Sequence, residues 1–392
     1  MTAPSAAAPA AAPIGALFLA TFASSVTLRM TDTLLPEIAR DFAVTPGTAS
    51  LAVTVYAIAY GLVQFVAGPL ADRFGKLAGI AFCCVVATLT AALCALATDF
   101  SSLLLARGLA GIAAGGVIPL GLAYVGDAVP VEQRQATLAR FMLGQMLGYI
   151  AGQVSGGAVG EHLGWRAAMW ISAGLFALGA AVLVAMAPQA LRGGGDRSAT
   201  GAPPLRVLLR RPAVIVVLAL VIPEGILMYG TYALIATDLH LRAGLSLTVA
   251  GLVMAMLGVG GLVYAATVSR LLDRFGRAGL PVLGAACHVA GLAILIVAPG
   301  LVTGLAALFL LGIGFYTVHT TLQAEATQMI PEARGLALSL FAGCFLAGQA
   351  IGVAWAGWTF DRFGAAPVFA TSALLLPVVA WQIHRMVRVA PR

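Results

Sequence analysis

Ionisable side chains are rare in this sequence, and a few lie inside apolar segments where they need a partner. Asp, Glu, Lys and Arg make up 9% of its 392 residues. Ser25, Arg29 and Asp32 share one face of an apolar segment, because they are spaced at i, i+4 and i+7. A charge in hydrocarbon costs about 3 kcal/mol, so it requires a counter-charge or a water-filled cavity. The predicted chemistry at Asp32 is reversible proton binding, in a cluster with Arg29 and Arg107.

The expected depths of Asp32 and Arg107 are similar. Asp32 lies four residues from the end of segment 14–36, and Arg107 lies six residues into segment 101–125. At about 1.5 Å per residue, these positions are about 6 and 9 Å deep. We expect Arg107 to hold Asp32 ionised until proton or substrate binding breaks the pair. The alternatives are a static charge cluster with Arg29, or an Asp32 that sits in interfacial water without a role.

Glu224 is the ionisable residue of greatest interest in the second half. It lies near the middle of segment 212–236, beside Pro223, and Met228 and Tyr232 follow at i+4 and i+8. A carboxylate, a soft thioether and an aromatic ring on one face suit a lipophilic cation. The alternative is a protonated Glu224 bonded to a neighbouring helix, with Met228 and Tyr232 as packing residues.

Segment 301–324 carries a second polar face. Phe315, His319 and Gln323 follow one another at i, i+4 and i+8. His319 is a candidate second titrating group, because histidine changes its charge near neutral pH. The alternative is an ordinary hydrogen-bonded histidine. His288, in segment 279–297, is assigned a structural role.

The elements that must position these residues follow from the composition. Hydrophobic residues make up 61% of the chain, and its mean hydropathy is +0.99. Soluble domains are about 45–50% apolar and about 25% charged. A soluble enzyme, a nucleic-acid binder and a disulfide-stabilised secreted protein are therefore disfavoured, although the net charge is +7. The five cysteines lie in apolar stretches and are assigned to packing.

Apolar runs of membrane-spanning length recur along the chain. The expected segments are 14–36, 48–70, 78–97, 101–125, 137–159, 166–187, 212–236, 246–268, 279–297, 301–324, 335–357 and 366–384. The uncharged Ala/Pro tract 1–13 is predicted to be a disordered cytoplasmic tail. The long polar stretch 189–211 is predicted to be a cytoplasmic linker between the halves 14–188 and 212–392.

Positive charge alternates between successive connections. The connections after every second segment contain most of the basic residues, namely Arg73, Lys76, Arg134, Arg192, Arg197, Arg206, Arg210, Arg211, Arg270, Arg274, Arg277 and Arg334. The opposite connections contain Arg40, Arg166, Arg242 and Arg362. Because cytoplasmic loops are enriched in Lys and Arg, both termini are predicted to be cytoplasmic.

The two halves also repeat one another. Residues 72–76 (DRFGK) match residues 273–277 (DRFGR). At an offset of 200, further matches are Arg134 with Arg334, Gly148 with Gly348, Gly152 with Gly352 and Gly164 with Gly364. Parallel repeats of this kind build one large class of transporters, with the substrate site between the halves.

These motifs carry a family resemblance across nearly the whole chain. Residues 68–76 (GPLADRFGK) resemble the signature loop of the major facilitator superfamily. Arg107 followed by Gly111, and Asp32 followed by Pro36, resemble motifs of its proton-coupled drug-efflux branch. The resemblance implies that the segments bearing Asp32, Arg107 and His319 line a central cavity. Gln153 departs from that branch, which normally carries proline there, and this weakens the inference to antiport.

A further group of residues is predicted to control the conformational change. Gly68 and Gly75 permit a tight turn, and Asp72 and Arg73 are expected to lock the cytoplasmic face, with Asp127 as the mate of Arg73. Gly148 and Gly152, in a series with Gly156, have the small-xxx-small spacing that allows close helix packing.

The sequence therefore predicts an all-α membrane protein with twelve transmembrane helices in two pseudo-symmetric bundles of six, the major facilitator fold. The resemblance implies proton-coupled efflux of small amphipathic or cationic compounds by a monomer in a bacterial inner membrane. A sugar or metabolite exporter and an uptake transporter are the alternatives. The expected partners are a small-molecule substrate, protons and the lipid bilayer, with no nucleic acid and no cofactor. An enzyme or a non-transporting receptor is disfavoured.

Overall fold

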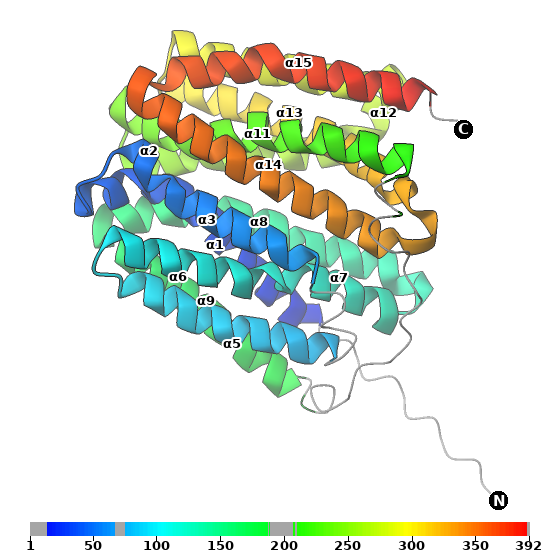
Figure 1. The fold of residues 1–392 in the computed structure, drawn as a ribbon, viewed down its shortest axis with the longest axis horizontal. Coiled ribbons are helices and arrows are strands. Elements are labelled where there is room, and N and C mark those ends of the chain that lie inside the picture. The colour runs from blue at the N-terminus through cyan, green and yellow to red at the C-terminus, as the bar shows by residue number, and fades with distance from the viewer. Residues whose placement is uncertain (1–13, 67–74, 187, 189–206, 208–209, 390–392) are drawn as a thin grey trace, which may run out of the picture.

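The computed structural model describes residues 14–66, 75–186, 188, 207 and 210–389. The predicted tail, most of the predicted linker, and the predicted gating residues Gly68, Asp72 and Arg73 lie outside the described residues. Every regular element in the described part is helical. Figure 1 shows these helices side by side, with the C-terminal end of α15 at one end of the molecule and α2 at the other.

The first half contains α1 (Ile14–Asp41), α2 (Pro46–Ala49), α3 (Leu51–Gln64), α5 (Lys76–Ala95), α6 (Phe100–Gly115), α7 (Val117–Ala128), α8 (Val131–Leu163) and α9 (Trp165–Met186). The second half contains α11 (Pro212–Leu241), α12 (Leu247–Val297), α13 (Leu301–Met329), the 3₁₀ turn η1 (Pro331–Ala333), α14 (Arg334–Phe363) and α15 (Ala365–Val389).

Most of the predicted segments coincide with one of these helices or with part of one. Segment 101–125 is divided between α6 and α7, and segment 48–70 covers part of α2, all of α3 and residues 67–70, which lie outside the described residues. Ten helices in the described part of the chain are long and apolar enough to cross a membrane. One of them, α12, holds two predicted segments, which meet at Gly276, where φ is 65°. The remaining segment is α8, which is 33 residues long but less apolar. The chain is thus a multi-pass membrane protein.

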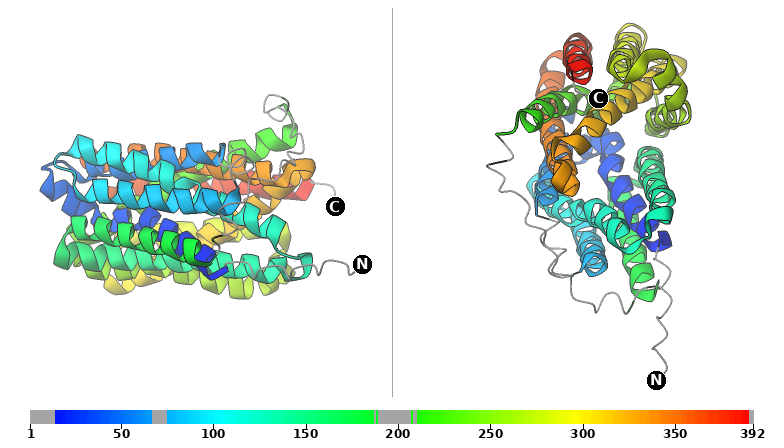
Figure 2. Two further views of the ribbon diagram at one scale, coloured as in Figure 1. Left: turned by 90° about the horizontal axis from the view of Figure 1, so that it is seen from below. Right: turned by 90° about the vertical axis from the view of Figure 1, so that its right-hand side faces the viewer.

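The helices form two groups that meet mainly along two pairs of helices. Within the first group α1 packs on α8 and α5 on α9, and within the second α11 packs on α14 and α12 on α13. Between the groups, α8 packs on α12 and α3 packs on α14. Figure 2 shows the groups as an upper and a lower set when the molecule is viewed along its helices. This arrangement places α1 and α11 beside the boundary between the halves.

Glycines bring the paired helices into backbone contact. A Cβ atom added at Gly148 or Gly152 would lie 2.7 Å from the Phe22 carbonyl oxygen or 2.6 Å from that of Val26 on α1. In the second half, a Cβ atom at Gly352 would lie 2.4 Å from the carbonyl oxygen of Ile226 on α11. The predicted close packing at Gly148 and Gly152 is confirmed, and the repeat extends it to the second half.

Replacing Gly152 with alanine should therefore destabilise the protein. We expect a loss of about 1–3 kcal/mol, because the new methyl group displaces α8 from α1. Thermal unfolding in detergent measures the effect. Gly174→Ala on α9 is the matched control, since no atom lies within 4 Å of its added Cβ, and a helical Gly→Ala change is otherwise stabilising. Equal melting temperatures for the two variants would contradict the role of the glycine contact.

Two turns of the repeat show the left-handed backbone that favours glycine. Gly75, at the start of α5, has a φ of 90°, and its counterpart Gly276 has a φ of 65°. Gly164 and Gly364 form a second matching pair, with φ of 81° and 75°. The left-handed backbone at Gly75 recurs at the same place in the second half, while the rest of the turn predicted there lies outside the described residues.

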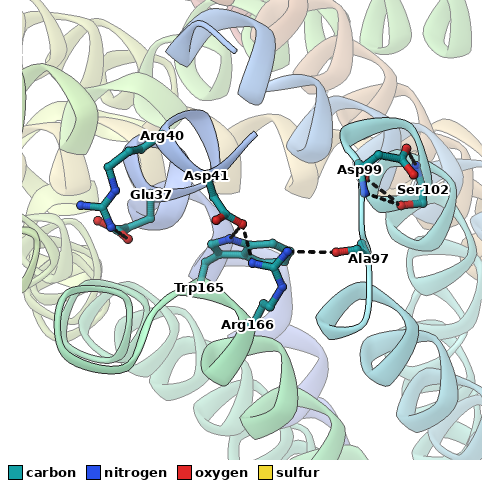
Figure 3. A network of polar contacts seen from close by, with 8 residues as sticks. All are labelled: Glu37, Arg40, Asp41, Ala97, Asp99, Ser102, Trp165 and Arg166. Atoms are coloured by element: carbon teal, nitrogen blue, oxygen red, sulfur yellow. Dashed lines mark hydrogen bonds and ion pairs between the residues drawn. The ribbon is translucent and has the colours of Figure 1, made fainter. Parts of the chain in front are cut away.

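A polar network joins three connections at the α2 end of the first half (Figure 3). Asp41, the last residue of α1, pairs with Arg166 and accepts a hydrogen bond from Trp165 Nε1 at 3.0 Å. Arg166 also donates to the Ala97 carbonyl oxygen at 3.0 Å. Asp99 caps the start of α6 nearby. The network fixes the end of α1 against the first turn of α9.

At the opposite end, each half has an ion pair of its own. Asp127 on α7 pairs with Lys76 on α5. Arg277 on α12 pairs with Glu325 on α13 at 2.7 Å. The described mate of Asp127 is therefore Lys76, whereas the sequence predicted Arg73, which lies outside the described residues. Both described pairs stay within one half.

Candidate functional site

A small central cavity lies where the two halves meet. Its volume is about 20 Å³, which is room for about one water molecule. Its polar lining comes from α1 and α8 on one side and from α11 and α13 on the other, and includes Arg29, Asp32, Tyr149, Gln153, Tyr229 and Tyr316. Two predicted proton-site residues, Arg29 and Asp32, therefore lie at the boundary between the halves.

Asp32 is buried deeper than its sequence position suggested. Helix α1 continues to Asp41, so nine residues separate Asp32 from the helix end, or about 14 Å. Its Oδ2 atom lies 3.6 Å from Arg29 Nη1 and accepts a hydrogen bond from Gln153 Nε2 at 3.3 Å. Its Oδ1 atom has no hydrogen-bond partner among the described residues. One oxygen of the Asp32 carboxylate thus contacts a guanidinium group and an amide group, and the other oxygen has no hydrogen-bond partner among the described residues.

Arg29 connects Asp32 to the second half of the molecule. Its guanidinium carbon lies 3.7 Å from the centre of the Tyr229 ring on α11. Its Nη2 atom donates to Gln349 Oε1 on α14 at 3.4 Å. Cation–π contacts gain strength when water is excluded, and Arg29 is only 5% exposed. One guanidinium group therefore contacts both halves at their boundary.

Among the described residues Arg107 forms no ion pair with Asp32, whose nearest cation is Arg29. Arg107 is buried on α6, where its Nε atom donates to the Ala52 carbonyl oxygen at 3.2 Å. Its guanidinium carbon lies 4.1 Å from the centre of the Tyr56 ring. Arg107 faces α3 because α6 packs against that helix. The position nearest Asp32 is taken by Arg29, one helical turn away on α1.

Glu224 and His319, which the sequence analysis considered separately, form one pair. Glu224 Oε1 lies 3.0 Å from His319 Nδ1, and the Glu224 side chain is fully buried while that of His319 is 17% exposed. Glu224 Oε2 has no partner among the described residues. Pro223 lies inside α11 without interrupting it. The pair connects α11 to α13 close to the boundary.

Aromatic rings surround the histidine of this pair. The Phe315 ring stacks on His319 with centroids 4.9 Å apart, and the rings of Phe341 and Phe345 lie at 5.2 and 4.6 Å. Gln323, the third residue of the predicted face, is half-buried and takes no part in the pair. The pair thus combines one carboxyl group on Glu224 with several aromatic ring faces around His319.

Met228 and Tyr232 are both buried, but they differ in their surroundings. Met228 belongs to the apolar core. Tyr232 borders the central cavity, while its hydroxyl group lies 3.1 Å from His288 Nδ1 and donates to the Leu311 carbonyl oxygen. His288 Nε2 contacts Ser372 Oγ at 2.9 Å. The structural role predicted for His288 agrees with this buried network, which also fixes the Tyr232 ring.

Three residues at Arg29 were missed by sequence reasoning. Tyr229 directly follows Met228 and therefore lies beside the predicted face of Glu224, Met228 and Tyr232. Gln349 was not considered. Tyr149, which follows Gly148, was not considered either, and its ring centre is 5.5 Å from the Arg29 guanidinium carbon. The repeat offers a signal, because the offset of 200 that aligns Gly148 with Gly348 also aligns Tyr149 with Gln349.

Comparison with known families identifies the chain. The family model of the Major Facilitator Superfamily matches residues 17–353, which include every residue at the central cavity. The chain belongs to the Major Facilitator Superfamily. As a superfamily member it is a secondary transporter, and small molecules and the lipid bilayer are its partners.

Curated superfamily members are similar over most of their length. The chloramphenicol resistance protein of Streptomyces lividans is 27% identical over 326 residues, which cover 82% of each chain. The inner membrane transport protein YdhP of Escherichia coli strain K12 is 26% identical over 345 residues, or 88% of each chain.

Solved superfamily structures share the fold at low sequence identity. The peptide transporter POT in complex with sulfate has a TM-score of 0.80 at 15% identity, covering 96% of this chain and 94% of that one. A bacterial homologue of the human lysosomal transporter Spinster has a TM-score of 0.78 at 17% identity, covering 98% of both chains. The predicted major facilitator fold is confirmed.

Proposed function

We propose that this protein exports small amphipathic or cationic compounds in exchange for protons. The observation that carries the proposal is the Asp32–Arg29 pair, which is buried in the central cavity and contacts both halves of the molecule. An intramembrane acidic residue marks a proton or substrate pathway more often than a packing site. The exchange would proceed by alternating access, in which the cavity opens to one side of the membrane at a time.

Proton binding at Asp32 competes with its contact to Arg29. Burial favours the neutral acid, whereas the guanidinium group favours the carboxylate. When Asp32 takes up a proton, the ion pair is lost and Arg29 keeps its contacts with Tyr229 and Gln349. When the proton leaves, the ion pair forms again. The proton therefore changes how one cation is shared between the two halves, which is the type of coupling that alternating access requires.

The Glu224–His319 pair supplies the proposed substrate contact. Neither Glu224 nor His319 borders the described cavity. Once the cavity widens to reach them, a cation can replace His319 as the partner of Glu224, and the surrounding phenylalanine rings offer apolar and cation–π contacts. Since the cavity has a volume of about 20 Å³, it must widen before a substrate enters. Tyr232 already borders the cavity, whereas Met228 belongs to the apolar core and would support the helix that carries Glu224.

Two further observations support export from a cell. One of the similar proteins is named a chloramphenicol resistance protein, and resistance is consistent with efflux. Another is named an inner membrane transport protein, which supports a place in a bacterial inner membrane. The distribution of Lys and Arg supports cytoplasmic termini, so that the α2 end would face outward. The proposed functional unit is a monomer with its own central cavity.

Transport by the purified protein in liposomes tests the proposal. Liposomes with an imposed pH difference would be given a panel of cations, neutral drugs and sugars, with substrate and proton fluxes recorded together. We expect cationic amphiphiles to move against the direction of the protons, and the flux to stop when an ionophore removes the pH difference. Transport that is indifferent to the pH difference, or that follows the protons, would overturn the proposal.

A further inference from the structure

At the α2 end, a carboxylate from the second half binds the start of a helix in the first half. Asp361, in the last turn of α14, accepts a hydrogen bond from the backbone N–H of Gly47 at 2.7 Å. It also accepts one from the hydroxyl group of Thr45 at 2.5 Å. Thr45 is the N-cap residue of α2, which leads directly into α3. The first N–H groups of a helix lack partners within the helix, and a carboxylate satisfies them well.

In an equivalent contact, a carboxylate from the first half binds the start of a helix in the second half. Glu161, in the last turn of α8, accepts a hydrogen bond from the backbone N–H of Thr248 at 2.7 Å. Thr248 is in the first turn of α12, which begins at Leu247. Each half thus lends one carboxylate to the helix start of the other half.

The internal repeat relates the two contacts. Glu161 and Asp361 are 200 residues apart, and each follows a glycine by four residues. A Cβ atom at Gly157 would lie 2.2 Å from the Leu247 carbonyl oxygen, and one at Gly357 would lie 2.6 Å from that of Gly47. Leu247 and Gly47 are again 200 residues apart. The repeated unit is a glycine that admits the partner helix and a carboxylate that binds its first turn.

These hydrogen bonds differ in their position from the exposed ion pairs in the described part of the chain. Lys76–Asp127 and Arg277–Glu325, at the opposite end, each join helices of the same half. The Arg40–Glu37 pair at the α2 end lies within α1. In the described residues, the hydrogen bonds that cross between the halves at the α2 end are those of Glu161 and Asp361. They must break if the halves separate there.

We propose that Glu161 and Asp361 are gating residues. Their hydrogen bonds hold the two halves together at the α2 end, and these bonds break when that end opens. The proposal rests on alternating access by this transporter, and it does not depend on which ion or substrate is carried. Hydrogen bonds from Thr248 lower the pKa of Glu161 to about 2. This carboxylate is therefore ionised at every pH at which a cell lives. The gate accordingly opens through the movement of the halves, with no proton taken up at Glu161.

Distance measurement between two spin labels tests the gate. In a variant without native cysteines, labels would be attached at Leu163→Cys and Phe363→Cys, which are 70% and 64% exposed and lie at the ends of α8 and α14. Pulsed electron–electron resonance without substrate or proton gradient then reports how far the α2 end is open. Glu161→Gln and Asp361→Asn should each raise the ratio of open to closed molecules roughly fivefold, and the double variant roughly 25-fold.

Two further variants make the result decisive. Glu37→Gln is the matched control, because Glu37 lies at the same end but pairs within α1, and its distances should equal those of the parent. Thr248→Pro removes the N–H that Glu161 accepts together with the Thr248 hydroxyl group, at a helix position that tolerates proline, and it should open the end as Glu161→Gln does. If the double variant and Thr248→Pro both keep the parent's distances, the gating proposal is overturned. Loss of proton coupling with an intact gate would instead count against the proposed function.

Discussion

Asp32→Asn should reduce proton-driven transport about a hundredfold while leaving the protein folded. The amide cannot bind and release a proton, and Arg29 then keeps its buried charge without the carboxylate at 3.6 Å. A buried charge without its partner costs about 3 kcal/mol, which corresponds to about a hundredfold change in an equilibrium. Counterflow without a pH gradient should survive, because it requires no proton exchange. The measurement is substrate uptake into inverted vesicles, with and without an imposed pH difference.

Asp238→Asn is the matched control for this result. Asp238 is also a buried aspartate paired with an arginine, Arg242, at 2.8 Å. That pair lies at the α2 end, where Arg242 donates to the carbonyl oxygens of Leu295 and Ile296. Its loss should lower thermal stability and leave the proton dependence unchanged. Proton-driven transport by Asp32→Asn at the parent rate would remove Asp32 from the mechanism.

Glu224→Gln should separate cationic from neutral substrates. We expect the apparent affinity for cations to fall about 10- to 100-fold, because a desolvated charge contact contributes about 2 kcal/mol or more. Neutral compounds should be transported within about twofold of the parent rate, since the aromatic rings around His319 are unchanged. Competition between a labelled neutral substrate and a series of cations measures both effects in one preparation.

Glu325→Gln provides the control for the Glu224 variant. Glu325 is a second carboxylate on α13, the helix that carries His319, but it pairs with Arg277 on α12. Its replacement should change neither substrate class. If Glu224→Gln weakens cationic and neutral substrates equally, the negative charge has no role in recognition, and the pair with His319 is a packing contact.

The elements and their repeat could be predicted from the sequence because they depend on local patterns. Runs of apolar residues set the helices, and repeated glycines set the close pairs, so that Gly148 and Gly152 were assigned correctly. Gly276, which matches Gly75 in the repeat, has the same left-handed backbone as Gly75. These features require only the composition and spacing of nearby residues.

The partners in the site could not be predicted in the same way. The end of α1 lies at Asp41, five residues beyond the predicted end of the segment, and this error placed Asp32 too near the surface. The rotation of α6 turns Arg107 towards Tyr56, which no periodicity within α6 reveals. Glu224 and His319 are 95 residues apart, so their pairing depends on how α11 and α13 pack. Contacts between helices depend on depth and rotation, which the sequence leaves open.

The Asp32–Arg29 pair has a consequence for the driving force. One carboxylate can exchange one proton per cycle, and one singly charged cation leaving for each proton entering moves no net charge across the membrane. Export of such a cation would then respond to the pH difference alone. A neutral compound exchanged for the same proton would move one charge inward, and the membrane potential would add about 2.3 kcal/mol per 100 mV. Substrates of different charge would therefore draw on different parts of the same electrochemical gradient.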